Sequence, residues 1–75
     1  MDPWLQAAAA DVAGVAGIDA VELELTAADA ELLLELARRA SHGSGDRKNA
    51  PLLCYLAGIA AGRGASLDEI VAKVQ

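Results

Sequence analysis

The 75-residue chain contains few of the residues that cross-link small domains. It has one cysteine, Cys54, so it cannot form an internal disulfide bond. Its one histidine, His42, adds too few ligands for a structural zinc site of the usual nitrogen and sulfur type. Chains this short bury only about 60% of the surface that they expose when unfolded. Stability must therefore come from close helix packing or from self-association.

Aromatic and strand-forming residues are also scarce. Trp4 and Tyr55 are the only aromatic residues, and phenylalanine is absent. Alanine, leucine, glutamate and arginine dominate the chain, and all four favour helices. The sequence therefore predicts one all-α domain over residues 1–75, a small four-helix bundle with three main helices and a short carboxy-terminal helix.

Positive charge is limited to six lysine and arginine residues against eleven acidic ones, for a net charge of −5. An acidic protein of this kind is a poor nucleic-acid binder, because that affinity depends on cations that meet phosphates. The longest apolar run, residues 50–62, is far shorter than the ~20 residues that span a bilayer. The amino terminus has no basic segment of the signal-peptide type. We expect a soluble cytoplasmic protein with no membrane or nucleic-acid partner.

Residues 50–62 carry no charged and no strongly polar side chain. If this segment is helical it is apolar on every side, and such a helix is normally surrounded by protein. We therefore predict a central helix here, with the other three helices packed around it.

The remaining helices have recognisable starts. Asp2 and Pro3 predict a helix whose core-facing stripe is Trp4, Leu5, Ala8 and Val12 and which ends at Gly14 or Gly17. Thr26 begins a helix that we expect to run to about Ser41, with Gly43 after its end. Ser66 and Glu69 form a capping box for the last helix, with the stripe Leu67, Ile70, Val71 and Val74.

Two segments connect these helices. Residues 18–25 alternate apolar and acidic side chains but have no second strand to pair with, so they predict an extended connector or a short helical turn. Residues 41–49 are polar and contain two glycines, which predicts a flexible linker, with Asp46 or Asn49 as the cap of the next helix.

A basic cluster stands out at this linker. Arg38, His42, Arg47 and Lys48 are candidate contacts for an anion or a partner, because four of the six cations lie within residues 38–48. Arginine and histidine near a helix carboxy terminus also complement its dipole, which is the ordinary alternative.

Catalytic and cofactor motifs are not recognisable. Cys54 lies in the apolar segment, where a cysteine usually packs as a small hydrophobe. We expect no catalytic residue, no metal site and no cofactor, and hence a protein that is not an enzyme.

Five short segments stand out as a set: Trp4-Leu5, residues 33–38, His42-Gly43, Ala50-Pro51-Leu52 and residues 56–62. In these segments the chain resembles a small helical domain of unknown function from high-GC bacteria. That family occurs alone or attached to nucleotidyltransferases similar to those that make the molybdopterin dinucleotide cofactor. The pattern differs at residues 44–49 and at Leu53, Cys54 and Tyr55, where Thr, Thr and Phe are usual.

This resemblance implies an accessory or protein-interaction domain linked to a nucleotidyltransferase of molybdenum-cofactor metabolism. The alternative is a small module that binds an anion or nucleotide at the basic cluster. The apolar composition further predicts a homodimer formed by exposed parts of the first and third helices.

Overall fold

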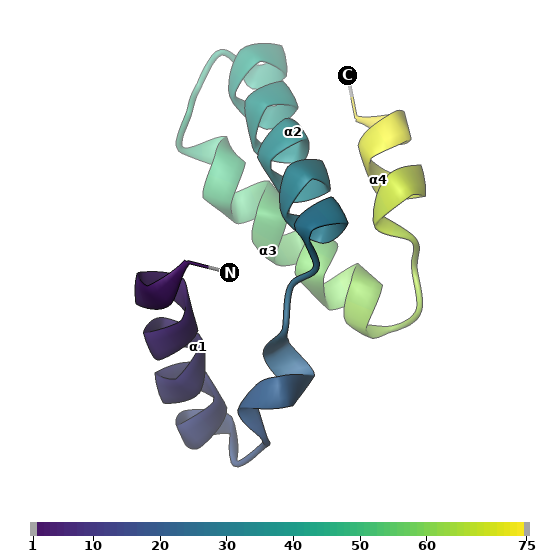
Figure 1. Cartoon of the computed structure of the whole chain (residues 1–75). Helices are drawn as coiled ribbons and strands as arrows, with labels where there is room; N and C mark the ends of the chain where they lie inside the picture. The colour runs from purple at the N-terminus through teal and green to yellow at the C-terminus, as the bar shows by residue number, and fades with distance from the viewer. Residues whose placement is uncertain (1, 75) are drawn as a thin grey trace.

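The chain folds into helices joined by short turns, and the computed structural model describes residues 2–74 (Figure 1). The elements are α1 (Pro3–Ala16), a 3₁₀ turn η1 (Ala20–Leu23), α2 (Ala27–Ser44), α3 (Asn49–Gly62) and α4 (Leu67–Lys73). No strand occurs among residues 2–74. The predicted all-α fold, with three main helices and a short last one, is confirmed.

The first helix begins and ends where its local chemistry predicts. The Asp2 carboxylate accepts hydrogen bonds from the backbone N–H groups of Trp4 (2.7 Å) and Leu5 (3.1 Å). At the other end Gly17 has φ = +70°, which a residue without a Cβ adopts at no cost. Of the two alternatives for residues 18–25, the short helical turn is correct, because Asp19 and Glu22 cap η1 reciprocally.

The second helix is longer than expected. Thr26 accepts a hydrogen bond from the Asp29 N–H, as predicted, but α2 continues to Ser44 and ends at Gly45, where φ is +75°. The predicted end near Ser41 with Gly43 after it is wrong. Helical and left-handed conformations are both open to glycine, so two glycines two residues apart leave the end undefined. The linker shrinks to residues 45–48.

The third helix starts without the side-chain cap that we predicted. Lys48 holds the N-cap position and makes no capping hydrogen bond, while the Asp46 carboxylate accepts from the Lys48 N–H (2.9 Å) in the preceding turn. Pro51 is accommodated in the first turn of α3, where its missing N–H costs nothing. The Ser66 half of the predicted capping box of α4 is confirmed, because the Ser66 hydroxyl accepts from the Glu69 N–H.

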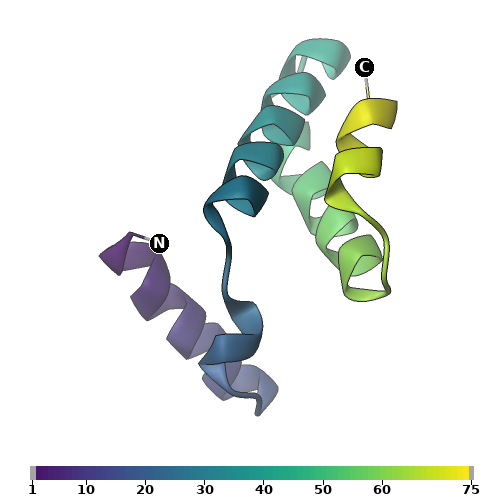
Figure 2. The same ribbon diagram turned by 45° about the vertical axis from the view of Figure 1, so that its right-hand side comes forward.

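Helix α2 forms the spine of a three-helix unit. α3 runs back beside α2, and α4 packs on α2 in the same general direction (Figures 1 and 2). Leu36 of α2, Ala57 of α3 and Val71 of α4 form the buried core cluster. Leu36 is the one fully buried large side chain among residues 2–74, so the core is small.

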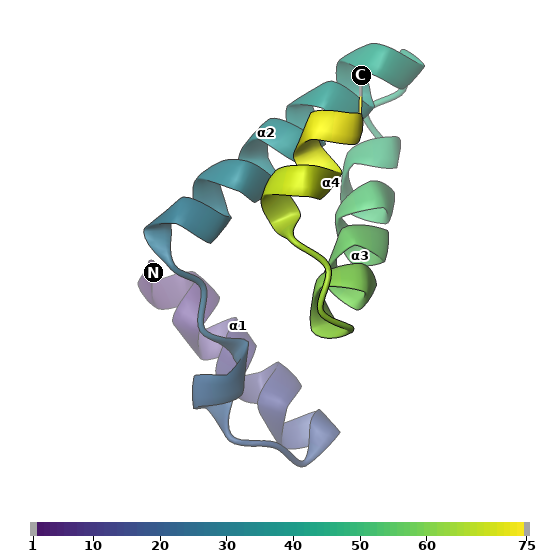
Figure 3. The same ribbon diagram turned by 90° about the vertical axis from the view of Figure 1, so that its right-hand side faces the viewer.

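Helix α1 stands apart from this unit and lies against η1 (Figures 2 and 3). Among the described residues its backbone has no close contact with α2, α3 or α4. Only near its start do Asp2 and Leu5 line a small pocket with residues 25–27 and 30. The predicted packing of the Trp4 stripe on the core is therefore wrong, and Ala13, on the η1 side, is the buried residue of α1.

The prediction that residues 50–62 are surrounded by protein is also wrong. Among residues 2–74, only α2 and α4 contact α3, and Ala57 is its one buried residue. The physical reason is the position of α1, which leaves one whole side of α3 uncovered. None of the helices among residues 2–74 has the length and apolar character needed to cross a bilayer.

Candidate interaction surface

Helix α3 has two apolar faces, and only one of them is covered. Leu53, Cys54 and Ala57 pack toward the core cluster. The opposite side carries an uncovered set that we call the α3 stripe: Leu52, Tyr55, Leu56 and Ile59. At 3.6 residues a turn these four side chains fall within an arc of about 100°. Their i, i+3, i+4, i+7 spacing is typical of a helix face that packs on another element.

Helix α1 carries a second uncovered set, which we call the α1 stripe: Trp4, Leu5, Val12 and Val15. These side chains also fall within an arc of about 100°. Val15 is 93% exposed, so this end of the stripe contacts almost nothing. Val12 and Val15 line a shallow apolar hollow with Asp11 and Ala16. Helices α1 and α3 have equal lengths of 14 residues.

The tryptophan and the tyrosine both belong to these stripes. Trp4 is 76% exposed and Tyr55 is 70% exposed. Large aromatic side chains supply much of the binding energy where proteins meet, because they bury a large area at a small loss of conformational entropy. The only two aromatic residues of the chain thus contribute to its surface and not to its core.

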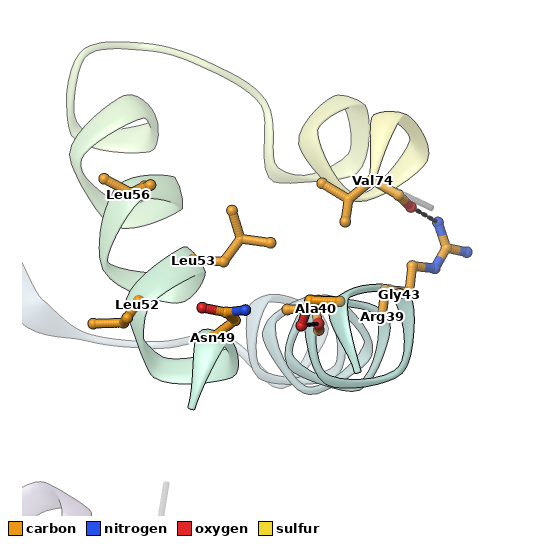
Figure 4. Close-up of a pocket in the computed structure, with 9 residues that line it drawn as sticks. Arg39, Ala40, Gly43, Asn49, Leu52, Leu53, Leu56 and Val74 are labelled. Atoms are coloured by element: carbon orange, nitrogen blue, oxygen red, sulfur yellow. Dashed lines mark hydrogen bonds between the residues drawn. The ribbon is translucent and has the colours of Figure 1, made fainter. Parts of the chain in front are cut away.

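An apolar groove of about 400 Å³ lies between α2, α3 and the end of α4 (Figure 4). Ala40 and Gly43 of α2 lie on one side of it, and Leu53 and Val74 point into it from the other two elements. Leu52 and Leu56 also line this groove, so it is continuous with the α3 stripe.

Arg39 closes one end of the groove and ties α4 to α2. Its Nη1 donates to the carbonyl oxygens of Val71 (2.6 Å) and Val74 (3.3 Å), which lie at the carboxy-terminal end of α4. The Val71 carbonyl also accepts from the Val74 N–H (3.3 Å), so the guanidinium adds a second donor there. Its positive charge complements the dipole at this end of the helix. Its Nε donates to Glu35 (2.7 Å), which holds the side chain in place.

The structure brings together only part of the basic cluster. His42 and Arg47 line one open depression, together with Ser41, Gly45 and Asp46. Arg38 lies elsewhere on α2 and donates to both carboxylate oxygens of Glu35. Lys48 is exposed at the start of α3 and does not line the depression.

Glu35 is the acidic partner of two arginines, as its spacing predicts. Hydrogen bonds from Arg38 and then Arg39 hold the pKa of this carboxyl below its usual value of 4.5. Arg38 is therefore engaged within α2, where it shares the single negative charge of Glu35 with Arg39.

Cys54 sits on the inner side of α3. Its Sγ is 3.8 Å from the Leu33 carbonyl oxygen, to which it donates, and burial raises the pKa of the thiol. A thiolate nucleophile requires the opposite shift. Among residues 2–74 no group of three or more His, Cys, Asp or Glu side chains converges on a point where a metal ion could bind.

The whole chain, residues 1–75, matches the model of a protein family described as a domain of unknown function, DUF6457. The chain belongs to this family. No curated protein and no solved structure matches this DUF6457 domain. The family assignment therefore agrees with the resemblance in kind, a small domain of unknown function, and adds no activity to it.

The two stripes contain residues that sequence reasoning placed on the wrong side. The spacing of Leu52, Tyr55, Leu56 and Ile59 is visible in the sequence, but α3 is equally apolar on its other face. Val15 belongs to the same face of α1 as Trp4 and Val12 and extends the predicted stripe by nearly one turn. The apolar composition predicts exposed parts on the first and third helices, but no pattern indicates which face of each helix is exposed.

Proposed function

We propose that this DUF6457 domain is a non-enzymatic accessory domain that works by binding a protein partner through the α1 and α3 stripes. The observation that supports this function is the exposure of both aromatic residues within two ordered apolar stripes. Soluble monomers rarely expose large contiguous apolar patches, and patches of that kind are typical of interaction sites. Helical stripes of this spacing suit helix-on-helix or helix-in-groove contacts.

The resemblance noted above suggests the class of partner. It points to a nucleotidyltransferase of molybdenum-cofactor synthesis, in which case the domain assists an enzyme and performs no chemistry of its own. A cytoplasmic site of action follows from such a partner. The raised pKa of Cys54 is consistent with a role that involves no catalytic thiol.

Calorimetry with a purified molybdopterin-dinucleotide-type nucleotidyltransferase from the same genome tests this proposal. We expect binding that Tyr55→Asp weakens at least about 30-fold, since aromatic residues at interface centres commonly contribute that much. The matched control is Leu34→Asp, which introduces the same charge at a leucine of α2 that is 72% exposed and lies outside both stripes. Absence of binding by the unmodified chain would show that the partner class is wrong.

Anion binding at the basic cluster is the second candidate function. The observation in its favour is that His42 and Arg47 line the same depression, although Asp46 shares it. A thermal-shift series with inorganic phosphate and nucleotides tests it, because a ligand of the folded state raises the melting temperature. Arg47→Ala should abolish a genuine shift, while Arg38→Ala, outside the depression, should preserve it.

A further inference from the structure

The chain exposes more surface than a closed monomer of its size. Its accessible surface is 5564 Å². A folded monomer of 7.6 kDa is expected to expose about 4,300 Å². The excess is about 1,300 Å² for each chain, against the ~800 Å² that each partner buries in an interface of standard size.

The size of the molecule indicates the same openness. The Cα radius of gyration is 12.9 Å, whereas a compact domain of 75 residues is expected near 11.3 Å, an approximate value from the scaling of domain size with length. The extra extent arises because α1 and η1 project away from α2, α3 and α4 (Figures 2 and 3). The projecting part and the three-helix unit each carry one uncovered stripe.

We propose that the surface excess is covered by a second copy of this chain, with the α1 stripe of each copy packed on the α3 stripe of the other. The inference rests on the proposed function, because it names a partner for the same stripes. Each pairing joins two 14-residue helices, and each stripe occupies an arc of about 100°. Reciprocal pairing is isologous, so a two-fold axis closes the assembly at two chains.

The area buried between the two chains distinguishes this arrangement from a dimer in which α3 pairs with α3. Two excesses of about 1,300 Å² sum to a buried area in the range of obligate homodimers, which begins near 2,000 Å². A contact between two α3 stripes would leave Trp4, Val12 and Val15 of both chains exposed to water. Only a contact that uses both stripes covers the whole excess. A transferase that bound the same stripes would have to displace the second copy.

Mixing two complementary variants tests the reciprocal geometry. Val15→Lys alters only the α1 stripe, and Leu56→Glu alters only the α3 stripe. Each variant alone has two impaired pairings per dimer, so we expect its dimer dissociation constant to rise at least about 30-fold. A mixed dimer has one unaltered pairing and one that joins opposite charges. Mixing the two monomeric variants should therefore restore a dimer.

Sedimentation equilibrium and light scattering, from low to high micromolar concentration, supply the measurement. We expect twice the chain mass of 7.6 kDa for the unaltered chain and for the control Leu34→Glu. Far-UV circular dichroism checks that each variant is helical. Val12→Lys with Leu52→Glu is a second pair, to be used if either first variant fails to fold.

Five outcomes would overturn the proposal. A dimer that Val15→Lys leaves intact means that α3 pairs with α3. Two monomeric variants that stay monomeric on mixing exclude reciprocity. Association without limit means that the pairing does not close. An unaltered chain that stays monomeric while binding the nucleotidyltransferase refutes the second copy and keeps the proposed function, whereas a monomer that binds neither refutes both.

Discussion

The core of this domain depends on one leucine, and its truncation is the sharpest test of the packing. Leu36 is fully buried and contacts the cluster that includes Ala57 and Val71. Leucine-to-alanine changes at buried sites cost about 2–5 kcal/mol, more where the cavity cannot collapse. Ala57 has no rotamer with which to fill the space, so we expect a loss of about 3 kcal/mol for Leu36→Ala.

That loss is large for so small a domain. At 0.05–0.15 kcal/mol per residue, a chain of this length has a free energy of unfolding of about 4–11 kcal/mol. A decrease of about 3 kcal/mol lowers the folding equilibrium constant more than 100-fold, since each 1.4 kcal/mol is a factor of about ten. The variant should be marginally folded at room temperature, and α4 should be the least protected helix of the three-helix unit.

The matched control lies two residues earlier on the same helix. Leu34 is 72% exposed, so Leu34→Ala should change the free energy of unfolding by no more than about 0.5 kcal/mol. Urea unfolding followed by far-UV circular dichroism measures both variants. Tryptophan fluorescence is a poor probe here, because Trp4 is on α1 and outside the core.

Equal losses in the two variants would refute this reasoning. They would mean that α2 presents a different face to α3 and α4 from the one described. A large loss for Leu34→Ala alone would place the core on the side of α2 that carries Arg38.

Three further predictions concern α2. Arg39→Ala should speed amide exchange across α4, because Arg39 binds α4 to α2. Arg38→Ala should not have this effect, because Arg38 binds Glu35 on its own helix. Equal exchange in both variants would contradict the role of Arg39 in holding α4. The pKa of Glu35 is lowered in the folded state, so its contribution to stability is present above pH 4.5 and disappears as the pH falls through the lowered value. Glu35→Gln should therefore flatten the acid limb of a plot of melting temperature against pH. An unchanged acid limb would refute this prediction. Gly45→Ala should lower the free energy of unfolding by about 1 kcal/mol, because φ of Gly45 is +75°. Gly43→Ala, inside the helix, should be neutral or stabilising. The reverse order of melting temperatures would mean that α2 ends at Gly43.

The starts of three helices could be predicted because capping is a local property. Asp2, Thr26 and Ser66 each accept a hydrogen bond from an N–H two or three residues later, so the acceptor and the donor lie within one short stretch of sequence. The same logic could have found the start of η1, since Asp19 and Glu22 have capping-box spacing.

Contacts between distant residues could not be predicted in this way. Arg39 is 32 and 35 residues away from the two carbonyl groups that it binds, and backbone carbonyls leave no mark in the sequence. Its pairing with Glu35 was predictable because i, i+4 neighbours share a helix face. Pairing between helix neighbours also explains why Arg38 does not join the rest of the basic cluster, since it binds Glu35 on its own helix.

The largest error concerned α3, and it carries the strongest argument for self-association. A helix that is apolar on every side is normally surrounded by protein, yet in the described part of the chain only α2 and α4 pack on α3. Among residues 2–74 the remaining helix is α1, and Trp4, Val12 and Val15 of its own apolar stripe are exposed. Each of the two helices therefore has an apolar face that needs a partner, and in the proposed dimer a second chain would cover both faces at once. The proposed dimer would also add buried apolar area to a core centred on Leu36, Ala57 and Val71, in a chain whose one cysteine cannot form an internal disulfide bond.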